Sequence, residues 1–116
     1  MTAGELCRLM SLGRYRFGHE TLLQDDVEAF LRKHDISYKR EYRLGPGDRV
    51  DFLVDGHIAL EIKVRANRKM IYRQLKRYAL HECIESLVLG TLTSMGLPPR
   101  IEGKPVYLLP FGRTGL

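Results

Sequence analysis

Two acids and a lysine occupy corresponding positions on two neighbouring stretches of alternating apolar and polar residues. Asp51 lies in the first stretch, residues 50–54, and Glu61 and Lys63 lie in the second, residues 58–64. This alternation predicts two strands joined as a hairpin, with the apolar residues on one face. Asp51 then lies directly opposite Glu61 on the other face, with Lys63 one pleat further on. The apolar residues of the predicted shared face are Val50, Phe52, Val54, Ile58, Leu60, Ile62 and Val64.

This pairing places two carboxylates close together. Directly opposed residues have Cβ atoms roughly 4.5 to 5.5 Å apart, so Asp51 and Glu61 would repel each other unless a cation lay between them. Mg²⁺ prefers carboxylate and water oxygens, and it usually keeps waters that a phosphate can displace. Lys63 would then stabilise the negative charge that grows as water attacks a phosphate ester. Taken alone, Glu61-x-Lys63 is more typical of an exposed ion pair, and it is Asp51 at the matching position that favours a metal site.

The length of the turn decides whether the two acids meet. Asp55-Gly56 is a common two-residue hairpin turn, but with it Asp51 and Glu61 would lie on opposite faces of the sheet. The apolar pattern requires an odd-numbered loop instead. We therefore predict a loop of three residues, 55–57, or a bulged variant of it.

A third acid lies on the apolar stripe of a predicted helix. Glu20 precedes Leu23 by three residues and Val27 by seven, so it continues the buried face. In the alternative interpretation, Thr21 and Gln24 form a capping box and Glu20 lies just outside the helix. The other acids near the start of this helix lie off the stripe and are predicted to be solvated: Asp25, Asp26 and Glu28.

A basic segment follows the second strand. No acid occurs from Ile62 to His81, and the whole chain carries a formal net charge of +5. The cations of this segment are Lys63, Arg65, Arg68, Lys69, Arg73, Lys76 and Arg77. Such a track beside an acidic site is what binding to a phosphate backbone requires. Gln74 and Tyr78, four residues apart, share the helix face beside the hairpin, and in the alternative interpretation Tyr78 is a core residue.

The remaining periodicity predicts the elements that position these residues. Helices are expected at residues 4–12, 20–34 and 68–82, and strands at 36–44, 50–54, 58–64, 84–92 and 105–109. Asn67 is a candidate N-cap for the third helix. An antiparallel hairpin followed by a helical crossover predicts an α/β fold with a mixed sheet.

Composition limits the class of protein. The chain has 116 residues, of which 44% are hydrophobic and 28% charged, so we expect a single domain spanning residues 1–116 and no disordered or low-complexity class. Its two cysteines lack C-x-x-C spacing and give no support to a zinc or disulfide scaffold. No apolar run approaches the ~18 residues of a membrane span and no signal peptide is visible, so an intracellular, cytoplasmic protein is expected.

The motif order resembles the PD-(D/E)xK nuclease superfamily over about residues 18–92. The most specific part is Arg49-Val50-Asp51-Phe52-Leu53-Val54 followed by Ile58-Ala59-Leu60-Glu61-Ile62-Lys63-Val64. Gln74-x-x-x-Tyr78 is similar to the RecB-like and phage exonuclease branch. Val50 stands where the family motif has proline, which removes no ligand but lowers the specificity of the motif. The resemblance implies a restriction-endonuclease-like core with the order αβββαβ, flanked by helices.

The resemblance also implies a chemistry. Such enzymes hydrolyse phosphodiester bonds of DNA, less often RNA, with Mg²⁺ or Mn²⁺. Asp51 and Glu61 would bind the metal together with the carbonyl of Ile62, and Glu20 would support it directly or through water. Lys63 would orient the attacking water or stabilise the transition state.

Gln74 and Tyr78 would border this site and contact the nucleic-acid backbone. Two other functions stay open: a structure-specific endonuclease resembling Holliday junction resolvases, which are similarly small and act as homodimers, and a catalytically inactive nucleic-acid-binding module of the same fold. A chain with room for little beyond a catalytic core also implies a homodimer or a partner subunit that selects the substrate.

Overall fold

The computed structural model describes residues 1–65, 67–92 and 95–111, and six strands within these ranges form one mixed sheet. The strands are β1 (Tyr38–Gly45), β2 (Asp48–Val54), β3 (Ile58–Lys63), β4 (Ser86–Thr91), β5 (Arg100–Ile101) and β6 (Lys104–Pro110). Their order across the sheet is β1-β2-β3-β4-β6-β5. β1, β2 and β3 pair antiparallel, β3, β4 and β6 pair parallel, and β5 is antiparallel to β6. The α/β fold with a mixed sheet is confirmed.

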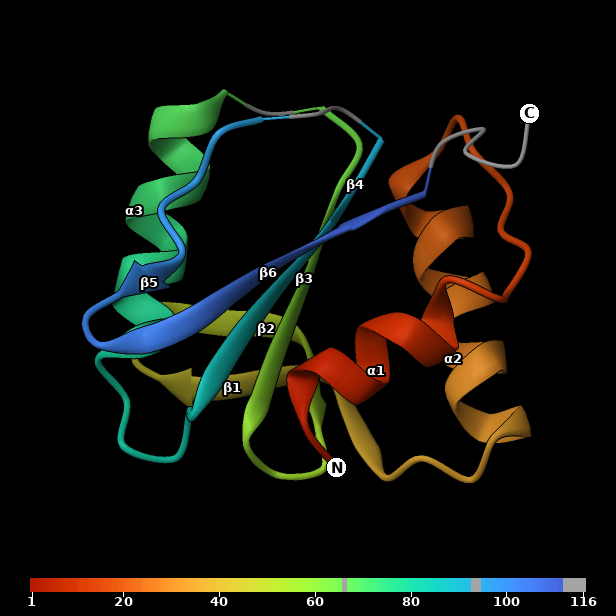
Figure 1. Ribbon diagram of the computed structural model, residues 1–116, viewed down its shortest axis with the longest axis horizontal. Coiled ribbons are helices and arrows are strands. Elements are labelled where there is room, and N and C mark those ends of the chain that lie inside the picture. Colours follow the sequence, from red (N-terminus) through yellow and green to blue (C-terminus); the bar gives the residue numbers. More distant parts are fainter. Residues whose placement is uncertain (66, 93–94, 112–116) are drawn as a thin grey trace.

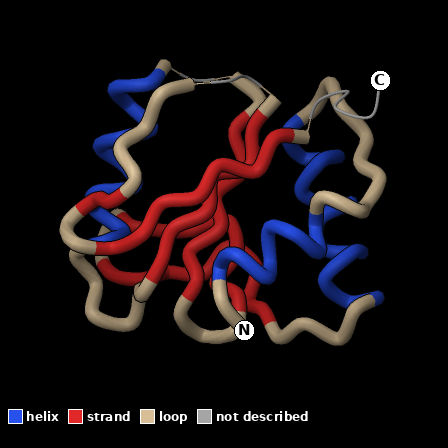
Figure 2. Tube along the Cα trace, viewed as in Figure 1, coloured by secondary structure: helices blue, strands red, loops and turns tan. Residues whose placement is uncertain are grey.

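Three helices cover the two faces of this sheet. α1 (Ala3–Met10) and α2 (Glu20–Lys33) pack on one face and α3 (Arg68–Ala79) packs on the other, as Figures 1 and 2 show. Two clusters of buried apolar residues result, one on each face of the sheet. Leu23 of α2 is buried in the cluster formed with α1 and α2, and Leu75 of α3 is buried in the cluster formed with α3. Among the described residues, no helix is long and apolar enough to cross a membrane.

The β2–β3 loop has the length that the apolar pattern predicts. Val54 pairs with Ile58, which leaves the three residues 55–57 between the strands. Asp55 and Gly56 both adopt positive φ angles, 53° and 77°, as the favoured hairpin turns require. The odd-numbered loop keeps Asp51 and Glu61 in reach of each other.

α3 forms the crossover from β3 to the parallel strand β4. The Asn67 side chain accepts a hydrogen bond from the Met70 N–H at 2.9 Å, which confirms the predicted N-cap. The helix ends at Ala79, three residues before the predicted end at residue 82. After the helix, the chain passes through buried Ile84 into β4. This crossover lays α3 over one face of β2 and β3.

The two faces of the β1–β2 hairpin exchange near its middle. Phe52 packs against α1 and α2, but Val50 packs in the cluster formed with α3. The prediction that Val50 and Phe52 share a face was therefore wrong. The cause is Glu41, which has a φ of 51° and lies across from Asp51, between the two register pairs that flank it. A left-handed residue inside a strand breaks the pleat and turns the following residues over.

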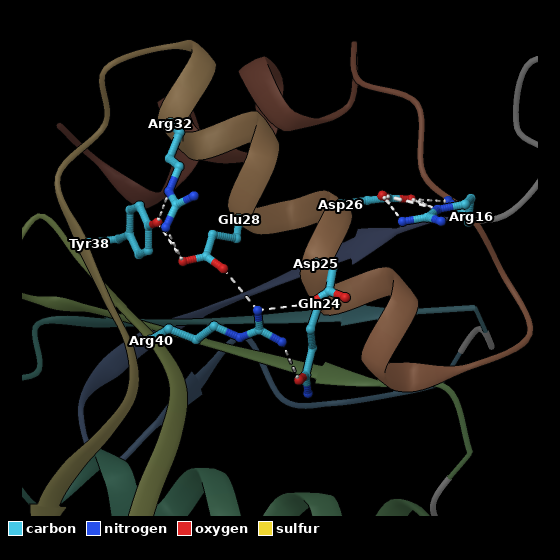
Figure 3. A network of polar contacts seen from close by, with 8 residues as sticks. All are labelled: Arg16, Gln24, Asp25, Asp26, Glu28, Arg32, Tyr38 and Arg40. Carbon is cyan, nitrogen blue, oxygen red and sulfur yellow. Dashed lines mark hydrogen bonds and ion pairs between the residues drawn. The ribbon is translucent and has the colours of Figure 1, made fainter.

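Polar contacts fasten α2 to β1. Arg40 of β1 donates hydrogen bonds to Asp25 Oδ1 at 2.8 Å, to Glu28 Oε1 at 2.9 Å and to Gln24 Oε1 at 3.3 Å. The Tyr38 hydroxyl donates to Glu28 Oε2 at 2.6 Å. Figure 3 shows these side chains converging between the helix and the strand. The network holds the helix that carries Glu20 against the sheet.

The same network corrects the prediction that the acids off the stripe of α2 are merely solvated. The side chains of Asp26 and Glu28 are only 19% and 20% exposed. Asp26 accepts hydrogen bonds from the backbone and the guanidinium of Arg16 (Figure 3). Sequence periodicity places a residue on a face of its own helix, but it does not show which cations another segment brings to that face.

β5 was not predicted. Ile101 pairs with Lys104 around the two-residue turn Glu102-Gly103, in which both φ angles are positive. This short hairpin covers the start of β6. The Glu-Gly turn beside the predicted strand was the only local signal for it, and two residues are too few to show a period.

Candidate metal and phosphate site

β2 and β3 separate at one end of their ladder, and two carboxylates bridge the gap. Paired residues continue as far as Phe52 and Leu60 and stop there. Beyond that point, the Ile62 N–H donates to Asp51 Oδ2 at 2.7 Å, and the Asp51 N–H donates to Glu61 Oε1 at 3.2 Å. Each acid thus accepts a backbone hydrogen bond from the other strand. The two carboxylates meet, but as replacements for missing ladder bonds rather than as an ordinary opposed pair.

Glu61 is buried, Asp51 is partly buried, and both carboxyl groups have raised pKa values. Glu61 is 2% exposed, and burial raises its pKa to about 7, with a further contribution from the charge of Asp51. Burial likewise raises the pKa of Asp51, and the charges of Glu20 and Glu41 act in the same direction. Lys63 opposes both shifts. When both acids are ionised, the site holds two negative charges beside the one lysine.

Lys63 and Tyr78 each take one oxygen of the Glu61 carboxylate. Lys63 Nζ lies 3.3 Å from Glu61 Oε2. The Tyr78 hydroxyl lies 3.1 Å from Glu61 Oε1 and 2.8 Å from the carbonyl oxygen of Arg49. Tyr78 is 1% exposed, so it is a core residue and a neighbour of the acid pair at once. Gln74 and Tyr78 lie beside the hairpin, as their helical spacing predicts.

Glu20 reaches the end of β3 from the face of the sheet that α1 and α2 cover, opposite the face of Tyr78 and α3. It is the first residue of α2, and its Oε2 accepts a hydrogen bond from the Val64 N–H at 3.1 Å. The N-cap is His19, which makes no side-chain capping bond, so the alternative capping box of Thr21 and Gln24 is wrong. The charge of Glu20 contributes to the raised pKa of Asp51.

The predicted basic track divides into engaged and unengaged cations. Arg68 donates to the Gly96 carbonyl, Lys76 lies 3.7 Å from Glu102 Oε2, and Arg77 lies 3.0 Å from Asp48 Oδ1. Three other cations are exposed and make no hydrogen bond or ion pair to the residues that the structure describes: Arg65, Lys69 and Arg73. These three belong to the loop after β3 and to α3. They follow the acid pair directly in the chain.

Glu41 is the acid of this region that sequence reasoning missed. It lies across from Asp51 on β1, and its charge raises the pKa of Asp51. Regular pairing from the turn at Gly45-Pro46-Gly47 would place Glu41 across from Phe52, and it is the shift in register between Arg43 and Gly45 that brings it across from Asp51. Its left-handed backbone left no signal, because glutamate rarely adopts a positive φ.

The donor set of the acid pair fits a hard divalent cation. Asp51 Oδ1 makes no hydrogen bond to any described residue, and Glu61 Oε2 faces only Lys63. No group of three or more metal-binding side chains converges within residues 1–65, 67–92 and 95–111. Two carboxylates are nevertheless a usual protein contribution to Mg²⁺, which takes its remaining ligands from waters and phosphates.

Glu61 should make the stability of the metal-free protein depend on pH. Its pKa is about 7 when folded and 4.5 ordinarily, so between these values the folded state binds the proton that the unfolded state has lost. The free energy of unfolding should fall by on the order of 3 kcal/mol as pH rises from about 4.5 to about 7. Urea denaturation across this range, in EDTA, measures it.

Glu61→Gln should flatten most of this pH dependence and should stabilise the protein above pH 7. Glu82→Gln, a change of the same kind at an exposed position after α3, should leave the wild-type slope unchanged. An equally steep profile for Glu61→Gln and wild type would show that this carboxyl is not the buried acid described above.

No protein-family model matches the sequence, and no curated protein or solved structure matches it either.

Proposed function

We propose that this chain is a metal-dependent nuclease that hydrolyses phosphodiester bonds of DNA. The observation that carries the proposal is the charge balance at the separated end of β2 and β3. Asp51 and Glu61 lie together at a position where Glu61 is buried and Asp51 partly buried, and Lys63 is the one cation among the described residues that forms an ion pair there. A structural ion pair needs one acid for one lysine, and a second buried carboxylate costs free energy unless another cation joins it. A divalent cation supplies the missing charge.

The topology supports the same proposal. The order α2-β1-β2-β3-α3-β4 follows the αβββαβ order expected of a restriction-endonuclease-like core. In such a core, a hairpin and a helical crossover bring the motif residues to one end of the sheet. Here the acid pair, Lys63 and the N-terminus of α2 are gathered in this way. We therefore include this core in the proposal.

Asp51 and Glu61 would hold the cation, with the carbonyl oxygen of Ile62 as a further ligand and Glu20 acting through water. Mg²⁺ or Mn²⁺, when bound, supplies a Lewis acid that lowers the pKa of water and offsets the charge of the phosphate. Carboxylate and carbonyl oxygens are the hard ligands that these ions prefer. The exposed edge of the acid pair, on the side of Lys63, is where substrate oxygens would enter.

The chain's own residues then have separate tasks. Lys63 places a positive charge next to the acid pair and stabilises the additional negative charge of the transition state. Tyr78 and the Asp51 N–H fix Glu61 Oε1, so this carboxylate keeps its orientation. The unengaged cations Lys69 and Arg73 bind the backbone of the strand that reaches the site.

A cleavage assay tests the proposal. The intact protein is incubated with Mg²⁺ or Mn²⁺ and with linear, nicked, flapped and four-way-junction DNA, and EDTA serves as the control. We expect metal-dependent cleavage that EDTA abolishes. Preferential cutting of the four-way junction would favour the resolvase-like alternative. Binding of DNA without cleavage under every condition would contradict the proposal and favour an inactive binding module.

A further inference from the structure

Two arginines oppose each other on the outer half of the β1–β2 hairpin. Arg43 and Arg49 are direct partners in the antiparallel register, and both are exposed. Residues in such a pair have Cβ atoms roughly 4.5 to 5.5 Å apart, and like charges there destabilise the sheet. The charges of this pair do not stabilise the sheet, whereas an anion that bridges the two guanidiniums would remove their repulsion.

The neighbours of Arg49 show which face it occupies. Asp48 binds Arg77 of α3 at 3.0 Å, and Val50 packs in the cluster formed with α3. Arg49 lies between two residues that both point to the α3 side. Because successive side chains of a strand point to opposite faces, Arg49 projects from the face turned away from α3.

Arg43 occupies the same face by the same reasoning. Its neighbours Tyr42 and Leu44 both pack against the α3 cluster. Arg43 therefore projects away from α3, beside Arg49. The two guanidiniums form a cationic pair on the face of the sheet opposite the basic helix.

No acid neutralises this pair within the described part of the chain. Neither guanidinium has a hydrogen bond or an ion pair there, whereas Arg40 on the same strand is paired with both Asp25 and Glu28. Glu41, the nearest acid along β1, makes no ion pair with either arginine. Arg43 and Arg49 are thus free to bind an anion from outside the protein.

The arginine pair lies close to the acid pair along β2, but on the other face of the sheet. Arg49 precedes Asp51 by two residues, which spans about 7 Å at the rise of a β-strand. The carbonyl of Arg49 is itself held by the Tyr78 hydroxyl, which also contacts Glu61. A nucleic-acid strand that brings one phosphate to the acids and continues across this end of the sheet would bring a neighbouring phosphate to these guanidiniums.

We propose that Arg43 and Arg49 together bind a backbone phosphate of the nucleic-acid strand that reaches Asp51 and Glu61. This inference rests on the proposed nuclease function for the identity of the anion. The planar fork of arginine matches the geometry of phosphate oxygens and allows paired hydrogen bonds. The strand then meets cations on both sides of the sheet, Arg43 and Arg49 on one side and those of α3 on the other.

Binding of single-stranded DNA tests this assignment. A 20-nucleotide strand is titrated, over a range of salt concentrations, with full-length protein carrying Asp51→Asn, which prevents cleavage. Adding Arg43→Gln and Arg49→Gln should weaken binding roughly tenfold at low salt. The slope of log K against log salt should become shallower by about 0.7 to 1.4, which corresponds to the loss of one or two phosphate contacts.

A matched control separates this contact from net charge. Arg14→Gln with Lys33→Gln removes the same two charges from a groove beside the C-terminal half of α2. This control should change the affinity less than about twofold, since one well-placed contact outweighs distant charge. Arg43→Lys with Arg49→Lys keeps the charges but loses the forks, and should fall between the parent and the glutamine variant. The melting temperature of the glutamine variant should be unchanged or raised, because the repulsion is relieved.

The outcomes distinguish this inference from the proposed function. Equal affinity and salt slope for the Arg43/Arg49 glutamine variant and the Arg14/Lys33 control would overturn the inference, even if the intact protein cleaves DNA. Conversely, DNA binding that depends on the arginine pair, in a protein that never cleaves when Asp51 is intact, would uphold the arginine site and overturn the nuclease proposal.

Discussion

Replacing Asp51 by asparagine should reduce metal-dependent cleavage of DNA by about 10³-fold or more, because loss of a metal ligand forfeits several kcal/mol of transition-state stabilisation. The asparagine carbonyl can still accept the hydrogen bond that Ile62 N–H now donates to the carboxylate. The substitution also removes one of two neighbouring acids whose charges repel each other. The melting temperature of the metal-free variant should therefore be equal to that of wild type or higher, and the loss of activity cannot come from unfolding.

The chain offers a matched control for this substitution. Asp48 lies three residues earlier on β2, and its carboxylate binds Arg77 and His81, at 3.0 and 2.9 Å, rather than the acid pair. Asp48→Asn should leave the rate of cleavage within a few-fold of wild type, although it removes an ion pair. Initial rates measured with Mg²⁺ on one DNA substrate compare the two variants. Cleavage that persists in Asp51→Asn would contradict the assignment of the acid pair.

Replacing Lys63 by methionine should lower kcat by roughly 10² to 10³-fold, the usual effect of removing one donor that stabilises charge in a transition state. Methionine keeps most of the apolar stem, so packing around β3 changes little. Because Lys63 holds down the pKa of Glu61, the variant should also titrate Glu61 at a higher pH. The metal itself should still bind, since both carboxylates remain.

Lys69→Met provides the comparison. Lys69 is an exposed cation of α3 with no partner among the described residues, so it is expected to bind backbone rather than to act at the reacting phosphate. Its substitution should raise KM and leave kcat almost unchanged. If Lys63→Met raised KM and left kcat unchanged, Lys63 would have the same role in binding as Lys69. It would then not act on the reacting phosphate.

Much of the scaffold could be predicted because strong local patterns specify it. The stripe of α2 and the cap at Asn67 depend on residues three or four positions apart, and both are found where the sequence places them. The odd-numbered β2–β3 loop followed from the requirement that apolar residues share a face. The same loop length brings Asp51 and Glu61 to matching positions, so their proximity could also be predicted.

The exact geometry of the acid pair could not be predicted, because it depends on breaks in regular structure. Alternation assumes an uninterrupted pleat, and the left-handed backbone of Glu41 interrupts it. Val50 accordingly turns to the α3 side, and the ladder between β2 and β3 ends before Asp51. Nothing in a glutamate side chain signals a positive φ.

Ion pairs between residues far apart in the sequence could not be predicted from local sequence patterns either. Arg77 appeared free on its helix, yet it binds Asp48 across 29 residues of sequence. Glu28 appeared solvated, yet it contacts both Tyr38 and Arg40 of a strand (Figure 3). Which cations remain available to a ligand follows from these partners, and the tertiary structure alone determines them.

Titration of Mn²⁺ into the metal-free protein, followed by calorimetry, tests most directly whether Asp51 and Glu61 form a divalent-cation site. The intact protein and Lys63→Met should each bind the ion, and Asp51→Asn and Glu61→Gln should bind it at least about tenfold more weakly, a loss of 1.4 kcal/mol or more. Equal binding of Mn²⁺ by the intact protein and both acid variants, or no binding by any of the four, would contradict the metal site.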